Sequence, residues 1–162
     1  MAALLLWDQS GYNMLNPRYV YSVLLFVLTA TSAFAQQAPA GRIKLVSGSV
    51  QIVRSGSTLP AGLGQVVYQA DSLRTGADGR VGITLNDDTR LSLGPGSEAR
   101  LDQFTFAPAE GKVGLVLDVV RGIVAYVSGR IAKLSPDSVK LQTPTAIVGV
   151  RGTTLAIRVA PE

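Results

Sequence analysis

The sequence has 162 residues with no cysteine and no histidine, which excludes disulfides, cysteine nucleophiles, thiolate or imidazole metal ligands and any catalytic triad with a histidine base. The net charge is +4, but the basic residues are spaced singly, without a basic run or interleaved aromatic residues, so we predict no nucleic-acid partner. The 17 glycines, together with 47% hydrophobic and 16% charged residues, favour one β-rich domain.

Residues 14–35 have the organisation of a Sec signal peptide. Arg18 precedes an apolar stretch over residues 19–30, and small residues then lead to Ala33-Phe34-Ala35. This A-x-A site predicts cleavage after Ala35 and a periplasmic or secreted mature protein. Residues 1–13 fit neither a signal peptide nor a fold, so we interpret them as a mis-assigned N-terminal extension and expect Met14, not Met1, to be the start.

An uncleaved membrane anchor is the alternative to cleavage. A spanning helix needs about 20 apolar residues, and this apolar stretch is shorter before it passes into Thr31 and Ser32. We therefore expect no stable membrane anchor in the mature protein. Residues 36–42 are predicted to be a linker of low β-propensity, and the folded domain is predicted over residues 43–162.

The domain is predicted to be all-β, because short runs of alternating apolar and polar residues are bounded by Gly, Asp, Asn or Pro. No stretch has a convincing helical period. The runs over residues 80–85 and 90–93 place Val81, Ile83, Leu85, Leu91 and Leu93 in the core. Two architectures bury the same residues and stay open at this stage: a β-sandwich or roll, and a short β-helical stack of many short strands.

Two turns are predicted between these strands, at residues 77–79 and 86–89. Their Asp, Asn and Gly residues tolerate left-handed backbone angles and bond nearby amides. We interpret the adjacent carboxylates of Asp87 and Asp88 as turn residues and not as a metal or acid/base pair, because neighbouring side chains diverge. In the first hairpin, Arg74 or Arg80 is expected to pair with Asp71 or Asp78.

The second half of the chain continues the alternation. Val113, Leu115, Leu117 and Val119 share one parity, and after Arg121-Gly122 the alternation resumes with Ile123, Ala125 and Val127. Of these, Leu115, Leu117, Ile123 and Val127 are predicted to be buried. Apolar residues of the opposite parity, such as Val124 and Tyr126, indicate a strand pair that is covered on both faces and lies in the middle of the fold. The glycines on either side of Arg151 predict a bulge or a sharp corner.

Five motifs, in this order, carry a resemblance to a known family. They are residues 48–52 (GSVQI), residues 71–81 (DSLRTGADGRV), residues 85–101 ending in LSLGPGSEARL, residues 120–122 (VRG) and residues 143–153 (TPTAIVGVRGT). The chain resembles the FecR family of periplasmic domains over nearly all of residues 43–159. The resemblance implies a β domain, its export and a role in binding, here in a stand-alone form with a signal peptide.

The candidate structural or interaction residues lie in these motifs. They are Arg74, Thr75, Gly76, Asp78, Gly79, Arg121, Gly122, Arg151, Gly152 and Thr153. Arg151 is expected to be an internal tie to backbone carbonyls or to a carboxylate such as Glu98, with a surface contact for a partner as the alternative.

The leading functional hypothesis is an exported, non-catalytic binding or scaffolding module whose partner is an envelope protein or glycan. The best-known members of the family are membrane-spanning regulators, so the alternative is a signalling component that acts with a TonB-dependent receptor or a sigma/anti-sigma regulator. An enzyme would depend on carboxylates alone, and glycoside chemistry would need two of them about 5 to 10 Å apart across a cleft. We predict no enzymatic activity, no cofactor and no metal, and the sequence makes no prediction of the oligomeric state.

Overall fold

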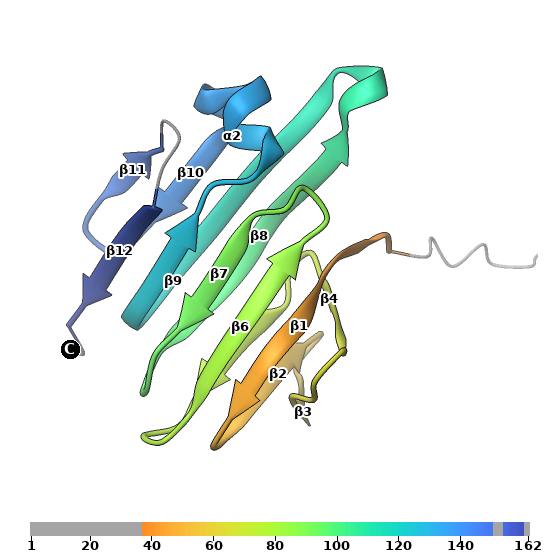
Figure 1. Cartoon of the computed structure of the whole chain (residues 1–162). Coiled ribbons are helices and arrows are strands. Elements are labelled where there is room, and N and C mark those ends of the chain that lie inside the picture. Colours follow the sequence, from red (N-terminus) through yellow and green to blue (C-terminus); the bar gives the residue numbers. More distant parts are fainter. Residues whose placement is uncertain (1–36, 151–153, 161–162) are drawn as a thin grey trace, which may run out of the picture. The chain divides into compact units, whose positions relative to one another are not determined.

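The computed structural model describes residues 37–150 and 154–160, which belong to one compact unit, Gln37–Glu162. This unit is all-β, as predicted (Figure 1). Its strands are β1 (Pro39–Ser47), β2 (Val50–Arg54), β3 (Ser57–Pro60), β4 (Val66–Tyr68), β5 (Ser72–Thr75), β6 (Arg80–Leu85), β7 (Arg90–Leu93), β8 (Glu98–Ala107), β9 (Lys112–Val127), β10 (Val139–Gln142), β11 (Ile147–Gly149) and β12 (Thr154–Val159). The helical elements are η1 (Pro108–Glu110), α2 (Arg130–Leu134) and η2 (Pro136–Ser138). Because β1 begins at Pro39, strand structure starts inside the segment 36–42 that the sequence assigns to a linker.

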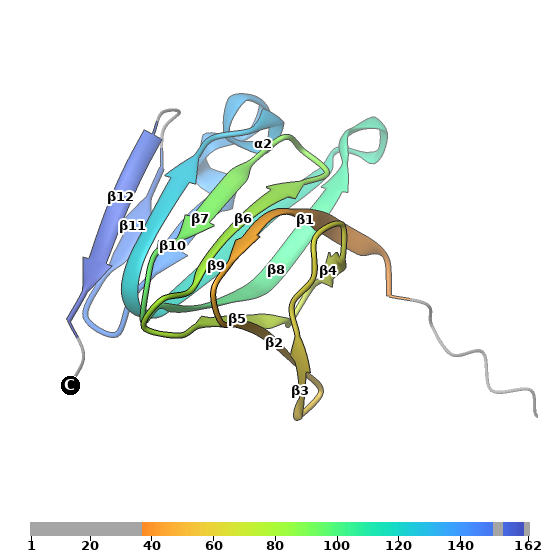
Figure 2. The ribbon, with the colours of Figure 1, turned by 60° about the horizontal axis from the view of Figure 1, so that its bottom comes forward.

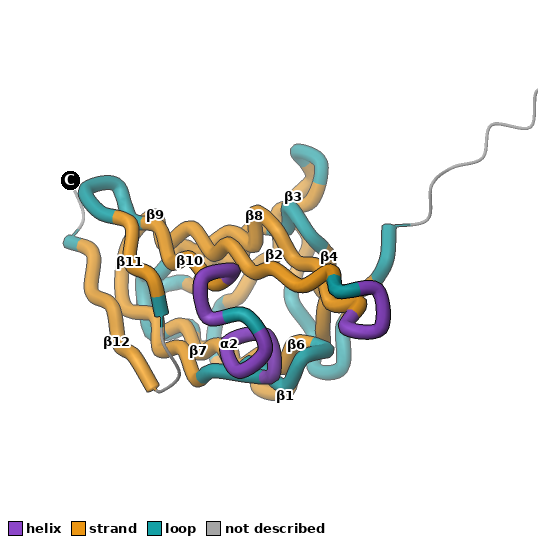
Figure 3. The backbone as a smooth tube through the Cα atoms, turned by 90° about the horizontal axis from the view of Figure 1, so that it is seen from above, coloured by secondary structure: helices purple, strands orange, loops and turns teal. Residues whose placement is uncertain are grey.

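The strands form two layers that share one long strand. Sheet A has the order β4-β1-β6-β7-β9-β12, and sheet B has the order β3-β2-β5-β8-β9-β10-β11. Residues 112–121 of β9 pair with β8 in sheet B, whereas residues 124–127 pair with β7 in sheet A. Figure 3 shows the two layers facing each other. All paired strands are antiparallel except β9 and β10, so the architecture is the sandwich or roll and not the β-helical stack.

β9 passes from one layer to the other by bending at Gly122, where the backbone φ is +84° (Figure 2). The register against β8 shifts at this point, because Glu98 pairs with Arg121 and the next residue, Ala99, pairs with Val119. An extra residue in one strand of an antiparallel pair is a β-bulge, which bends and twists the strand. The bend therefore comes from a local insertion in the register, together with a glycine that can adopt a positive φ.

The bend also reverses which side chains of β9 point inward. Leu117 and Val119 are buried before it, and Val124 and Tyr126 are buried after it. The prediction that Ile123 belongs to the core is wrong: its side chain is 38% exposed, and Val127 is only half-buried. A one-residue slip moves every later side chain of a strand to the other face.

Aliphatic side chains fill the interior between the layers. The other predicted core residues are buried, namely Val81, Ile83, Leu85, Leu91, Leu93, Leu115 and Leu117. Tyr126 is also fully buried, and this burial raises the pKa of its hydroxyl, with the nearby charge of Asp87 adding to the shift. The core is therefore a continuous cluster that both sheets contribute to.

The turn predicted at residues 86–89 is present, and it anchors a helix that was not predicted. The buried Asp87 carboxylate accepts hydrogen bonds from Thr89 Oγ1 (2.7 Å) and from the backbone N of Ile131 (3.3 Å). The Asp87 carbonyl accepts another from Arg130 N (2.7 Å). The neighbouring Asp88 is exposed, so the two carboxylates diverge as turn residues do. The five-residue helix α2 is too short to show a helical period, and tertiary hydrogen bonds to the turn stabilise it.

Candidate functional site

Thr75, from the first predicted motif, holds two segments together inside the fold. Its side chain is buried, and its hydroxyl donates to the carbonyl of Gly94 (2.7 Å). The same oxygen accepts a hydrogen bond from Ser97 N (2.8 Å). Thr75 therefore ties the end of β5 to the loop between β7 and β8, and it presents nothing to a partner.

Gly76, Asp78 and Gly79 fasten the β5–β6 turn to the Gly48–Ser49 turn between β1 and β2. Gly76 N donates to the Ser49 carbonyl (2.8 Å), and the Asp78 carboxylate accepts from Ser49 N (3.3 Å). A Cβ at Gly79 would overlap the Ser49 carbonyl oxygen and lie 2.8 Å from Gly76 N. The structure therefore assigns these three motif residues to turn packing.

Arg74 and Arg121 share the carboxylate of Glu98 on the outer face of sheet B. Arg74 Nε lies 2.7 Å from Glu98 Oε1, and Arg121 Nη2 lies 3.3 Å from Glu98 Oε2. Both pairs follow from the register, in which Glu98 stands opposite Arg74 on β5 and opposite Arg121 on β9. The two arginines are half-exposed, so a partner can reach them.

The predicted ion pairs within the first hairpin are wrong. Asp71 is fully buried, and its two carboxylate oxygens each lie 2.8 Å from Arg54, at Nε and at Nη2. Arg54 also lies over the Tyr68 ring, 4.4 Å from its centroid. Asp71 therefore pairs with Arg54 from β2, and Arg74 pairs with Glu98 from β8. Both partners are distant in the sequence and come from other strands than the predicted hairpin neighbours.

A groove opens next to Arg121, where the last strands of the two sheets separate. It has a volume of about 760 Å³ and is bounded by the bend of β9, the β10–β11 loop and β12. Its lining residues are Val120, Arg121, Thr143, Pro144, Thr145, Ala146, Val148, Ile157, Arg158, Val159 and Ala160. The volume lies within the range of typical ligand pockets, about 300 to 1,000 Å³.

The groove follows from the topology of β9. β10 extends sheet B beside the first half of β9, whereas β12 extends sheet A beside its second half. Among the described residues, β11 and β12 have no pairing with each other, so the roll stays open between them. Val148, Ile157 and Val159 pack partly against the core, which makes the floor of this opening apolar.

The rim of the groove is polar and is held in shape by the β10–β11 loop. Thr143 N donates to the Ala146 carbonyl (2.8 Å), and Thr143 Oγ1 accepts from Ala146 N (3.0 Å). These two bonds define a compact turn that projects Pro144 at the entrance. A preorganised loop costs less conformational entropy on binding than a flexible one.

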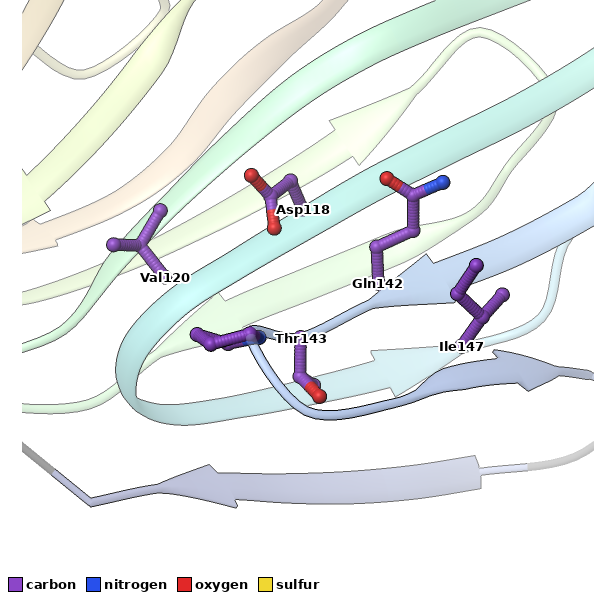
Figure 4. A pocket seen from close by; sticks show the side chains of 6 residues that line it. Asp118, Val120, Gln142, Thr143 and Ile147 are labelled. Carbon is purple, nitrogen blue, oxygen red and sulfur yellow. The ribbon is translucent and has the colours of Figure 1, made fainter.

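A shallower depression of about 360 Å³ continues from the groove along the outer face of sheet B (Figure 4). It shares Val120, Thr143 and Pro144 with the groove and adds Asp118, Gln142 and Ile147. Partial burial raises the pKa of Asp118, and the neighbouring Asp102 raises it further, while Arg100 partly offsets both effects. The depression thus combines a carboxylate and a side-chain amide with exposed aliphatic surface.

A family model described as FecR protein matches residues 71–162, which is more than half of the chain. The chain belongs to the FecR family. The matched range contains β5 to β12 and the whole groove, whereas β1 to β4 precede it. β1 and β2 nevertheless pair with β6 and β5, so they complete both sheets of the FecR fold. No curated protein and no solved structure matches the chain.

Three of the predicted FecR motif residues, Arg151, Gly152 and Thr153, lie outside the described residues. The internal tie through Arg151 therefore stays a prediction. Its suggested partner, Glu98, already accepts Arg74 and Arg121.

Sequence reasoning missed most of the groove. Asp118 is the available signal for the adjoining depression, because it places a charge in the middle of an apolar strand that is covered on both sides. Pro144 and the flanking threonines belong to the family motif at residues 143–153, which does not indicate that they line a binding site. Ile157 and Val159 belong to an alternating run, and this alternation does not reveal that β12 is the last strand of its sheet.

The described residues have neither a candidate membrane span nor a candidate metal cluster. Within residues 37–150 and 154–160, no helix has the length and apolar character needed to cross a membrane. The same ranges contain no group of three or more His, Cys, Asp or Glu side chains that could share a metal ion. The carboxylate of Asp102 pairs with Arg100 at 2.9 Å.

Proposed function

We propose that this FecR-family chain is an exported, non-catalytic binding module that docks an extended segment of an envelope protein in the groove between the β10–β11 loop and β12. The observation that carries the proposal is the apolar floor beneath β12, whose outer edge is unpaired among the described residues. An extended peptide can add to such an edge through main-chain hydrogen bonds while its alternate side chains enter the groove. Arg121 and Arg158 at the rim favour acidic residues in that segment.

Export is the first part of the proposal, and the signal peptide predicted over residues 14–35 supports it. The mature protein is expected to begin at Gln36 and to be recovered from the periplasm or the medium. N-terminal sequencing of protein purified from cell fractions measures this. Recovery of a chain that retains the residues before Ala35 would contradict export with cleavage.

Docking in the groove is the second part, and variants of neighbouring residues test it. Ile157→Asp places a charge on the apolar floor, and Pro144→Arg places bulk and charge at the entrance. Each is expected to reduce capture of an envelope protein from extract by about tenfold or more, since a buried unpaired charge or a steric block costs at least 1.4 kcal/mol. Ala156→Asp is the matched control, because Ala156 is exposed on the other face of β12.

The variants are compared at equal loading after their melting temperatures have been measured, because Ile157 also packs partly against the core. Pro144 is exposed, so its replacement keeps the test valid if Ile157→Asp does not fold. Equal capture by wild type, Pro144→Arg and Ala156→Asp would contradict docking in the groove.

Family membership favours a second candidate function, signalling with a TonB-dependent receptor or a sigma/anti-sigma regulator. The capture experiment separates the two candidates by the identity of the retained protein. A receptor or a regulator that is lost with Pro144→Arg would favour signalling, whereas another envelope protein would favour scaffolding.

A further inference from the structure

The outer face of sheet A carries exposed cations on five of its residues: Arg42 and Lys44 on β1, Arg80 on β6, Arg90 on β7 and Arg158 on β12. Figure 1 shows these strands side by side with β9 in one layer. Arg42 stands opposite Thr84, which in turn stands opposite Arg90, so these two arginines lie in one row across the sheet. Arg80 and Arg158 lie toward the other end of the strands, where Arg158 stands opposite Ile123. We call these five residues the cationic face.

None of the five cations has a carboxylate partner among the described residues. The ion pairs there join Arg54 to Asp71, Arg74 and Arg121 to Glu98, Arg100 to Asp102, Lys112 to Glu110 and Arg130 to Asp88. Arg42 donates one hydrogen bond to the carbonyl of Gly64 (3.2 Å), which leaves its charge unneutralised. The charges are therefore segregated: the arginines on the outer face of sheet B are paired, and those of sheet A face solvent.

Between the two cationic rows, Leu45 on β1 stands opposite Gly82 and is 53% exposed. The other residues of this middle row are small, so the backbone of β6, β7, β9 and β12 lies close to the surface there. Gly82, Ser92, Ala125 and Ala156 stand opposite one another across four neighbouring strands. The rows on either side are separated by four residues along a strand, or about 13 Å. From β6 to β12 the face is therefore flat, and it has positive charge along both margins.

Unpaired cations in this arrangement attract a ligand that carries several negative charges. No described aromatic residue lies in these rows, so the face lacks the stacking platforms on which single-stranded nucleic acids bind. A flat floor between two charged margins fits an extended chain with repeated carboxylate, sulfate or phosphate groups. We propose that the cationic face binds a linear anionic polysaccharide of the cell envelope.

The choice of a cell-envelope polymer as the ligand rests on the export that is part of the proposed function. Binding of an anionic polysaccharide to the cationic face does not depend on export. The purified protein is tested with polygalacturonate, a linear polymer with one carboxylate per sugar, and with neutral dextran. Phosphatidylglycerol vesicles and a single-stranded oligonucleotide are the competing probes. Binding to polygalacturonate is expected to weaken steeply as salt is added, and binding to dextran is expected to be undetectable.

The decisive variant replaces Arg42, Arg80 and Arg90 by Gln and leaves Arg158, which also lines the groove, unchanged. Its matched control replaces Lys112, Lys133 and Lys140 by Gln, which removes the same charge from exposed positions elsewhere. The first variant is expected to bind polygalacturonate about 10- to 100-fold more weakly than wild type, and the control to bind within about threefold of wild type. All six substituted strand or helix segments keep their apolar residues. Unchanged melting temperatures confirm that both variants are folded.

Equal weakening by the two variants would overturn the proposal, because net charge alone would then explain binding. Stronger binding to the vesicles or to the oligonucleotide than to polygalacturonate would also overturn it, in favour of a membrane surface or a nucleic acid. Pro144→Arg blocks the groove without touching this face, so it is expected to bind polygalacturonate as wild type does. A failure of groove docking is thereby distinguished from a failure of polymer binding.

Discussion

Gly122→Ala is expected to lower the free energy of unfolding by about 3 to 5 kcal/mol, which combines a left-handed backbone penalty with overpacking. The residue has φ +84°, and a Cβ there would lie 2.5 Å from the Cα of Ser97 and closer still to its side chain. Ser97 Oγ accepts a hydrogen bond from Ile123 N (2.8 Å) and donates one to the Ile123 carbonyl (3.1 Å). The added methyl group displaces the serine that holds the bend of β9.

Gly111→Ala is the matched control for this prediction. Gly111 also has a positive φ, +68°, but nothing lies within 4 Å of a Cβ built on it. Gly111→Ala is expected to lower the free energy of unfolding only by the left-handed backbone penalty, about 1 to 2 kcal/mol. Urea denaturation of the two variants measures the difference, and equal losses would show that Gly122 is needed for its φ alone and not for the close approach of Ser97.

The same variant connects the bend to the groove. Val120 and Arg121 line the groove and immediately precede Gly122. A shift of the bend therefore moves one wall of the groove relative to β12. Gly122→Ala is for this reason unsuitable as a binding-site variant, and the exposed Pro144 is preferred for that purpose.

Leu117→Ala is expected to cost about 2 to 5 kcal/mol of unfolding free energy, the usual range for truncating a buried leucine. Leu117 is 1% exposed and stands between Leu101 on β8 and Leu141 on β10, which are buried as well. β9 is fixed by neighbours on both sides here, so the cavity cannot close by a movement of the strand. The loss is measured by urea or thermal denaturation.

Leu134→Ala removes the same atoms from an exposed position and serves as the control. Leu134 ends α2 and is 59% exposed. Its replacement is expected to change stability by no more than about 0.5 kcal/mol. Similar losses for the two variants would contradict the placement of Leu117 at the centre of the core.

The all-β class, the core positions of β6 and β7 and the family resemblance could be predicted from the amino-acid sequence. The alternation that places Val81, Ile83 and Leu91 inside is a property of each strand, because successive side chains point to opposite faces whatever the strand pairs with. The turn at residues 86–89 was similarly readable, since Asn and Asp bond to their own backbone neighbours. Both signals depend only on residues that are close together in the sequence, so they predict strands and turns without knowledge of the fold.

The register of β9, the ion-pair partners and the groove could be seen only in the tertiary structure. Residues after Gly122 exchange faces because β9 leaves one sheet for the other, and nothing in the alternation of apolar residues marks that change. Glu98 lies between Arg74 and Arg121, which come from two other strands, so their pairing exists only once the strand order is set. The cationic face of sheet A also depends on the strand order. Its arginines are spaced singly in the sequence, and they share one face only because strands that are far apart in the chain pair with each other.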